Sequence, residues 1–192
     1  MPNQRLLKSV VLAASLLPLG DSVAAAEPRT TSDRPHNLYV IVVDSSGSYR
    51  KRQIEAVEKS HALLERVQAR RLRAKERPDQ IVVIAMDAIP EVIFRGDART
   101  LGDAARADWR TRFAGRGDYA ACTDVESGLR LALREAEADA AAQQKRILVF
   151  SDLVHEPPKR SMRACRAPSV PSVPEPGFPW HRLGDADLRM EV

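Results

Sequence analysis

Three short runs of apolar, mostly β-branched residues constrain the fold of this chain more than any other feature. They are Leu38–Val43, Ile81–Met86 and Ile147–Phe150. Apolar and polar residues do not alternate within these runs, which is typical of strands that are buried on both faces of a parallel sheet. Helical patterns separate the runs along the chain. The sequence therefore predicts an α/β protein in which helices cover both faces of a mainly parallel sheet.

The elements expected between and around these runs follow the order β-α-β-β-α-α-β. An amphipathic helix is predicted from about Arg50 to Lys75, a weaker helical segment over 97–113, and an Ala-rich helix from Val125 to about Gln144. The short strand Val92–Phe94 follows the second run after a brief turn, so we expect it to be antiparallel and at an edge, where Pro90 is tolerated. The predicted fold class is an α/β three-layer, Rossmann-like sandwich with one short antiparallel edge strand.

The first 26 residues have the pattern of a cleavable secretory signal. Arg5 and Lys8 precede an apolar stretch of about ten residues, and Ala24-Ala25-Ala26 stands before an expected cleavage point at Glu27. The alternative, an uncleaved anchor, requires a longer apolar run than this one. We therefore expect an exported protein, periplasmic or extracellular, with no membrane span in the mature chain.

Composition divides the remaining chain into four parts. Residues 27–37 are interpreted as a tether, 38–156 as one folded domain, 157–181 as a Pro-rich loop, and 182–192 as a further strand of the same domain. Proline lacks the amide hydrogen that regular structure uses, so the Pro-rich part is expected to be irregular.

Composition also argues against several classes of function. The basic residues between Arg66 and Arg77 lack interleaved aromatic side chains, so a solvated helix face explains them better than a nucleic-acid site. The chain has no Gly-rich phosphate loop with lysine and no Gly-x-Ser-x-Gly pentapeptide. Arg95-Gly96-Asp97 and Arg116-Gly117-Asp118 look like adhesion tripeptides, but coincidence is the expectation in a chain so rich in arginine.

Side chains with oxygen atoms gather at the expected ends of strands. Asp44, Ser46 and Ser48 follow the first apolar run, Thr123 precedes the Ala-rich helix, and Asp152 follows the last run. Ligands of open parallel sheets bind at the carboxyl ends of the strands. Two carboxylates and three hydroxyls, without His or Cys, form a hard set of donors that suits Mg²⁺ or Mn²⁺. The alternative for 44–48 is a helix-capping turn, which does not explain Thr123 and Asp152.

At these residues the chain resembles the von Willebrand factor A domain family with its metal-ion-dependent adhesion site. The family's Asp-x-Ser-x-Ser motif matches 44–48, its threonine matches Thr123 ahead of Gly128-Leu129, and its last aspartate matches Asp152. The resemblance covers about residues 37–156. It implies that Ser46 and Ser48 touch the ion directly, that Asp44 and Asp152 balance its charge, and that Thr123 binds it directly or through water.

The resemblance also implies a function. An open coordination position on the ion would accept a carboxylate from a partner protein, so we expect protein–protein interaction or adhesion, not catalysis. The alternative is a metal-dependent hydrolase at the same site. Leu153 stands where members often carry Gly, and Ala120-Ala121-Cys122 replaces a Gly-rich approach to the threonine. Both departures are expected to shift the geometry of the loops.

The chain beyond Asp152 gives two further expectations. Family members usually continue through another helix and more strands, so we expect the Pro-rich segment to leave an exposed or poorly formed sheet edge and a less stable protein. The alternative is that Leu188–Val192 pairs fully. Cys122 and Cys165 belong to loops that leave the same rim of the sheet, and we expect them to form a disulfide in an oxidising compartment. Two free thiols, or pairing with another chain, remain the alternatives.

Overall fold

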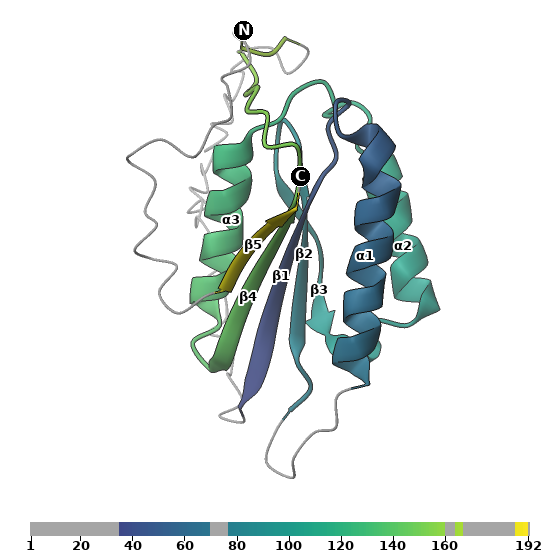
Figure 1. Ribbon diagram of the computed structural model, residues 1–192, viewed down its shortest axis with the longest axis vertical. Helices are drawn as coiled ribbons and strands as arrows, with labels where there is room; N and C mark the ends of the chain where they lie inside the picture. Colours follow the sequence, from purple (N-terminus) through teal and green to yellow (C-terminus); the bar gives the residue numbers. More distant parts are fainter. Residues whose placement is uncertain (1–34, 70–76, 160–163, 167–186, 192) are drawn as a thin grey trace, which may run out of the picture. The chain divides into compact units, whose positions relative to one another are not determined.

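The computed structural model describes residues 35–69, 77–159, 164–166 and 187–191. The predicted signal sequence, most of the tether and most of the Pro-rich segment lie outside these residues. The described part forms one sheet of five strands, flanked by helices (Figure 1). The elements are β1 (His36–Asp44), α1 (Arg50–Gln68), β2 (Gln80–Met86), β3 (Glu91–Asp97), the 3-10 turn η1 (Ala98–Thr100), α2 (Asp103–Ala114), α3 (Val125–Ala138), β4 (Ala142–Phe150) and β5 (Asp187–Glu191).

The sheet has the strand order β3-β2-β1-β4-β5. β1 pairs in parallel with both β2 and β4, β4 pairs in parallel with β5, and β3 is antiparallel to β2. The central strand β1 is hydrogen-bonded on both sides and covered on both faces, which explains its uninterrupted apolar run. The predicted fold class, including an antiparallel edge strand, is confirmed.

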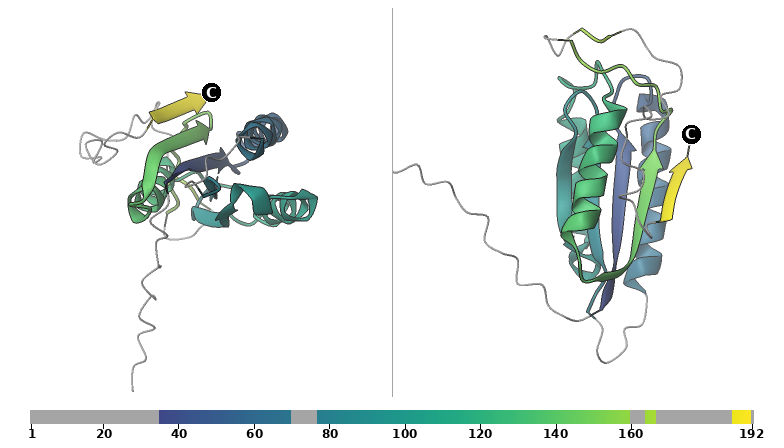
Figure 2. Two further views of the ribbon diagram at one scale, coloured as in Figure 1. Left: turned by 90° about the horizontal axis from the view of Figure 1, so that it is seen from below. Right: turned by 90° about the vertical axis from the view of Figure 1, so that its left-hand side faces the viewer.

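Alternate side chains of β1 face two separate layers of core. Tyr39, Ile41 and Val43 lie in a cluster with Leu64 of α1 and Trp109 of α2. The intervening residues of β1 lie in a second cluster with one face of α3, namely Val125, Leu129, Ala132 and Ala136. Figure 2 (right) shows α3 on one side of the sheet and α1 on the other. The described residues are thus a three-layer sandwich, and none of their helices is long and apolar enough to cross a membrane.

Several predicted boundaries are wrong. β1 begins at His36, inside the segment interpreted as a tether, and α1 ends at Gln68 instead of Lys75. The Ala-rich helix ends at Ala138, and the residues predicted as its last turn form the first half of β4. There the pairing of Ala142 with His36 on β1 overrides the helical propensity of alanine and glutamine. β3 is also longer than predicted, because it pairs with β2 as far as Asp97.

The C-terminal strand β5 is better formed than the sequence predicted. β5 pairs with β4 in continuous register from Asp187 opposite Arg146 to Glu191 opposite Phe150. A poorly formed edge is therefore wrong for these residues, and the alternative of full pairing describes them better. The local reason is that β4 presents a complete row of backbone groups to a parallel neighbour. β5 is nevertheless the outer strand of the sheet, and its side chains Arg189 and Met190 are exposed, so an exposed edge is present as expected.

Candidate metal centre

The candidate site lies where the winding of the sheet changes direction. From β1 the chain passes through α1 to β2 on one side, and it later reaches β4 on the other side of β1. The carboxyl ends of β1 and β4 therefore flank a topological switch point, the usual place for ligands of such sheets. Asp44 is the last residue of β1, and Ser151 and Asp152 follow β4 directly. The fold brings these residues to one rim.

Asp44 is fully buried. Its Oδ2 accepts a hydrogen bond from the Ser151 hydroxyl at 2.6 Å, and its Oδ1 accepts one from the Ser46 amide at 2.8 Å. Burial raises the pKa of Asp44 to about 6, and the charge of nearby Asp152 adds to this effect. Among the described residues no Lys, Arg or His forms an ion pair with this carboxylate.

Ser46 and Ser48 lie together beside Asp44. Their hydroxyl oxygens are 3.2 Å apart; Ser46 is buried and Ser48 is exposed. Between them, the Gly47 amide donates to the Ala120 carbonyl at 2.7 Å, so the loop that precedes Thr123 contacts this turn. The next helix, α1, begins after Tyr49 without a side-chain cap. The alternative interpretation of 44–48 as a capping turn is therefore wrong.

Thr123 is buried, and its backbone is fixed on the segment that follows β4. Its amide donates to the Glu156 carbonyl at 3.1 Å, and the Glu156 amide donates to the Thr123 carbonyl at 2.9 Å. A disulfide joins Cys122 to Cys165, with the two Cα atoms 5.5 Å apart. The expected disulfide is confirmed, and it anchors the loop immediately before Thr123.

Asp152 is half-buried, and its Oδ1 accepts a hydrogen bond from the Val154 amide at 3.1 Å. Between them Leu153 has a positive φ of 58°. Left-handed backbone costs a non-glycine residue about 1–2 kcal/mol. Leu153 stands where members of the family often carry Gly. Its backbone is therefore strained, next to the candidate ligand Asp152.

The predicted site residues are connected to different degrees. Asp44, Ser46 and Ser48 are linked by hydrogen bonds, and Asp152 is close enough to Asp44 to affect its pKa. Thr123 joins this group through backbone bonds of its loop. No group of three His, Cys, Asp or Glu side chains in the described residues is arranged to hold a metal. An ion at this rim would therefore depend on hydroxyl oxygens together with two carboxylates, which are hard donors.

Two features of the site were missed by the sequence reasoning. Ser151 donates to Asp44, and Asp87 forms a buried ion pair with Arg116. Asp87 directly follows the apolar strand β2, in the same way that Asp44 ends β1, and this signal was available in the sequence. The guanidinium of Arg116 is buried, so Arg116-Gly117-Asp118 does not present an exposed adhesion tripeptide.

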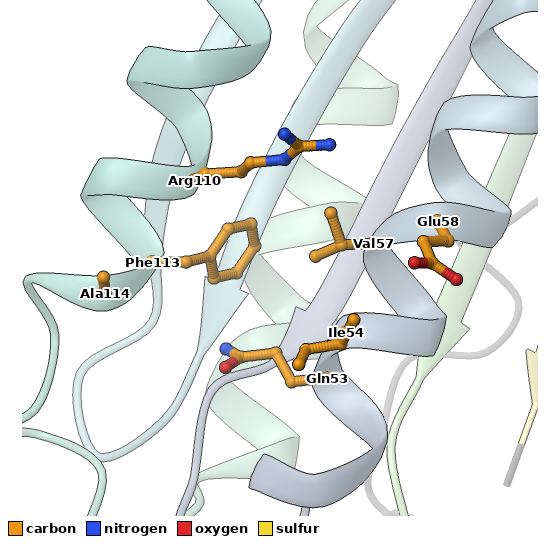
Figure 3. Close-up of a pocket in the computed structure, with 7 residues that line it drawn as sticks. All are labelled: Gln53, Ile54, Val57, Glu58, Arg110, Phe113 and Ala114. Atoms are coloured by element: carbon orange, nitrogen blue, oxygen red, sulfur yellow. The ribbon is translucent and has the colours of Figure 1, made fainter.

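A separate hollow of about 450 Å³ lies between α1 and α2 (Figure 3). Ile54 and Val57 of α1 and Phe113 of α2 contribute its apolar side chains, with Glu58 and Arg110 among its polar ones. Ile54 is 71% exposed. None of the predicted metal ligands lines this hollow.

The comparisons with known proteins agree with the fold. The von Willebrand factor type A domain family matches residues 39–155, and the chain belongs to this family. No curated protein matches the chain. A von Willebrand factor type A structure from Catenulispora acidiphila has 18% identity and a TM-score of 0.50, covering 81% of this chain and 33% of that one. Identities this low establish the fold alone.

Two further solved structures are similar to part of this chain. The pilus adhesin SpaC from Lactobacillus rhamnosus GG has 18% identity and a TM-score of 0.51, covering 64% of this chain and 16% of that one. Proximal thread matrix protein 1 from the mussel byssus, with a zinc-occupied MIDAS motif, has 11% identity and a TM-score of 0.49, covering 82% and 38%. The chain thus spans less than two fifths of the length of each of these proteins.

Proposed function

We propose that this domain binds a divalent cation at Asp44, Ser46, Ser48, Thr123 and Asp152 and uses it to bind a carboxylate of a partner protein. The observation that carries the proposal is the buried carboxylate of Asp44, which is held by Ser151 and the Ser46 amide and forms no ion pair with a basic side chain of the described residues. An uncompensated buried charge is costly, and a cation bound at the rim offsets that cost. Mg²⁺ or Mn²⁺ fits the oxygen donors best.

The arrangement favours binding over hydrolysis. A hydrolase at this rim would need a general base free to move a proton, and both oxygens of the Asp44 carboxylate already accept hydrogen bonds. When bound, the ion would supply Lewis acidity and an open position for a carboxylate oxygen. The side chains of the protein would supply charge balance and a fixed geometry. The occurrence of the fold in a pilus adhesin supports an adhesive or protein-binding role.

The pattern of the first 26 residues supports export to the periplasm or the extracellular space. A disulfide beside the site supports the same location, because disulfides persist in oxidising compartments. We therefore place the proposed adhesion outside the cytoplasm, with no role in nucleic-acid binding.

Calorimetric titration with Mg²⁺ and Mn²⁺ tests the cation site. The wild type should bind one ion, and Asp44→Ala and Thr123→Ala should bind it much more weakly. Thr111→Ala is a matched control, since Thr111 carries an exposed hydroxyl on α2 that donates to Ala107 of the same helix, outside the proposed ligand set. Absence of heat with both ions on the folded wild type would contradict the proposal. Partner capture from the exported fraction with and without chelator then tests the metal dependence of binding.

A further inference from the structure

Asp87 and Arg116 form a buried ion pair close to the candidate metal centre. The Arg116 Nε donates to Asp87 Oδ2 at 2.5 Å, and its Nη2 donates to Asp87 Oδ1 at 2.7 Å. Arg116 also donates to the Glu91 carboxylate at 2.5 Å and to the Ile89 carbonyl. Burial opposes the charge of Arg116, but the Asp87 and Glu91 carboxylates raise the pKa of its guanidinium above the ordinary value.

The pair connects the turn that carries Ser46 and Ser48 to the loop that leads to Thr123. Asp87 Oδ2 also accepts a hydrogen bond from the Ser45 hydroxyl at 2.8 Å, and Ser45 immediately precedes Ser46. The Asp87 carbonyl accepts the amide of Asp124, the residue after Thr123, at 3.0 Å. Arg116 stands at the beginning of the loop that contains Ala120, whose carbonyl accepts the Gly47 amide.

We propose that Asp87 and Arg116 are positioning residues for the metal centre, which hold the Thr123 loop against the Ser46–Ser48 turn. This inference rests on the proposed function. The oxygens of Asp87 are already bonded to Arg116, to Ser45 and to the Ile89 amide, so Asp87 acts through its neighbours and not as a ligand. Ligands that are ordered in advance bind an ion more tightly, because the ion does not have to order them.

The charge balance points in the same direction. Arg116 neutralises Asp87, so Asp44 and Asp152 remain the two carboxylates that face the cation in the proposed site. Without Arg116, the buried carboxylate of Asp87 would be an unpaired charge, and this would favour non-native arrangements of the rim. The sequence places Arg116 in a tripeptide that resembles an adhesion motif, and the structure gives this arginine an internal role instead.

The test uses the full mature chain and the double variant Asp87→Asn/Arg116→Met, which removes both charges together so that neither is left unpaired. Arg95→Met is the matched control. Arg95 forms a two-pronged ion pair with Glu135, at 3.0 and 2.5 Å, between β3 and α3, away from the rim. Mn²⁺ affinity is measured by calorimetry, and hydrogen exchange of the Gly47 and Asp124 amides is measured in chelator.

We expect the double variant to stay folded, to bind Mn²⁺ about 10–100-fold more weakly, and to exchange both amides at least about tenfold faster than the wild type. Arg95→Met should change neither readout at the rim. Wild-type Mn²⁺ affinity in the double variant, or unchanged protection of both amides, would overturn the positioning role while leaving the metal site intact. No Mn²⁺ binding by the wild type itself would refute the proposed function, and the positioning role with it. Asp87→Asn alone repeats the test should the double variant not fold.

Discussion

Replacing Asp44 by asparagine is expected to make the metal-free protein more stable at neutral pH. Burial raises the pKa of Asp44 from 3.8 to about 6, so the folded state holds this proton more tightly than the unfolded state does. At pH 7.5 the carboxylate is ionised in both states, and only the folded state has the unfavourable free energy of burying that charge. At about 1.4 kcal/mol for each pKa unit, that cost is about 3 kcal/mol. Asparagine has the same shape without the charge.

The contribution of Asp44 to the free energy of unfolding depends on pH. The stabilising contribution of protonated Asp44 is fully present below pH 4 and is lost as the pH rises through about 6. The free energy of unfolding of Asp44→Asn should therefore equal that of the wild type near pH 4 and exceed it by up to about 3 kcal/mol at pH 7.5. The carboxylates outside this rim are the same in both proteins, so the difference between them reports on Asp44 together with its neighbour Asp152.

Urea denaturation in chelator across pH 4–7.5 measures this difference. Asp152→Asn is the matched control, because this half-buried aspartate belongs to the same proposed ligand set. It should weaken Mg²⁺ binding as Asp44→Asn does, yet change the metal-free stability little. With millimolar Mg²⁺ only the wild type should gain stability by mass action. An Asp44→Asn protein that is no more stable than the wild type at pH 7.5 would refute the reasoning.

Three other experiments test the surroundings of the site. Replacing Cys122 and Cys165 by serine opens a loop with a sequence separation of 43 residues and should lower the free energy of unfolding by roughly 3–4 kcal/mol, measured in urea. Gly128→Ala should destabilise by about 1–3 kcal/mol, because its new Cβ would lie 2.6 Å from the buried Met86 Sδ; a rise in Tm would contradict this. Leu153→Gly should be about 1 kcal/mol more stable than Leu153→Ala, because both lose packing but only glycine relieves the positive φ.

The apolar strands were predictable because burial on both faces leaves an unmistakable run of side chains. The run from Leu38 to Val43 is covered by two core clusters, and it marked both the central strand and the position of Asp44 at its end. The first half of β4 was not predictable in this way. Its residues from Ala142 to Lys145 favour a helix locally, and pairing with β1 decides their structure.

Four of the predicted ligand residues lie at or just beyond the carboxyl ends of β1 and β4, where the topology alone brings them to one rim: Asp44, Ser46, Ser48 and Asp152. Thr123 lies in the loop between α2 and α3 and joins them through the backbone bonds of that loop. The Asp87–Arg116 ion pair joins residues 29 positions apart and depends on the path of the loop between α2 and α3. No local pattern marks such a pair. Likewise Leu153 was noticed as a departure from the family, but only its backbone conformation shows that the departure produces strain.

The disulfide between Cys122 and Cys165 has a mechanical consequence. Tension applied to the chain beyond Cys165 acts first on β5, which pairs with β4 at the edge of the sheet. Once β5 separates, the force passes through the sulfur atoms to Cys122 and bypasses the residues between them. About 150 Å of contour length, at about 3.5 Å per residue, is therefore protected from extension. Thr123 and Asp152 lie inside this protected loop, so two of the five proposed ligand residues would stay within a covalently closed loop under a pulling force.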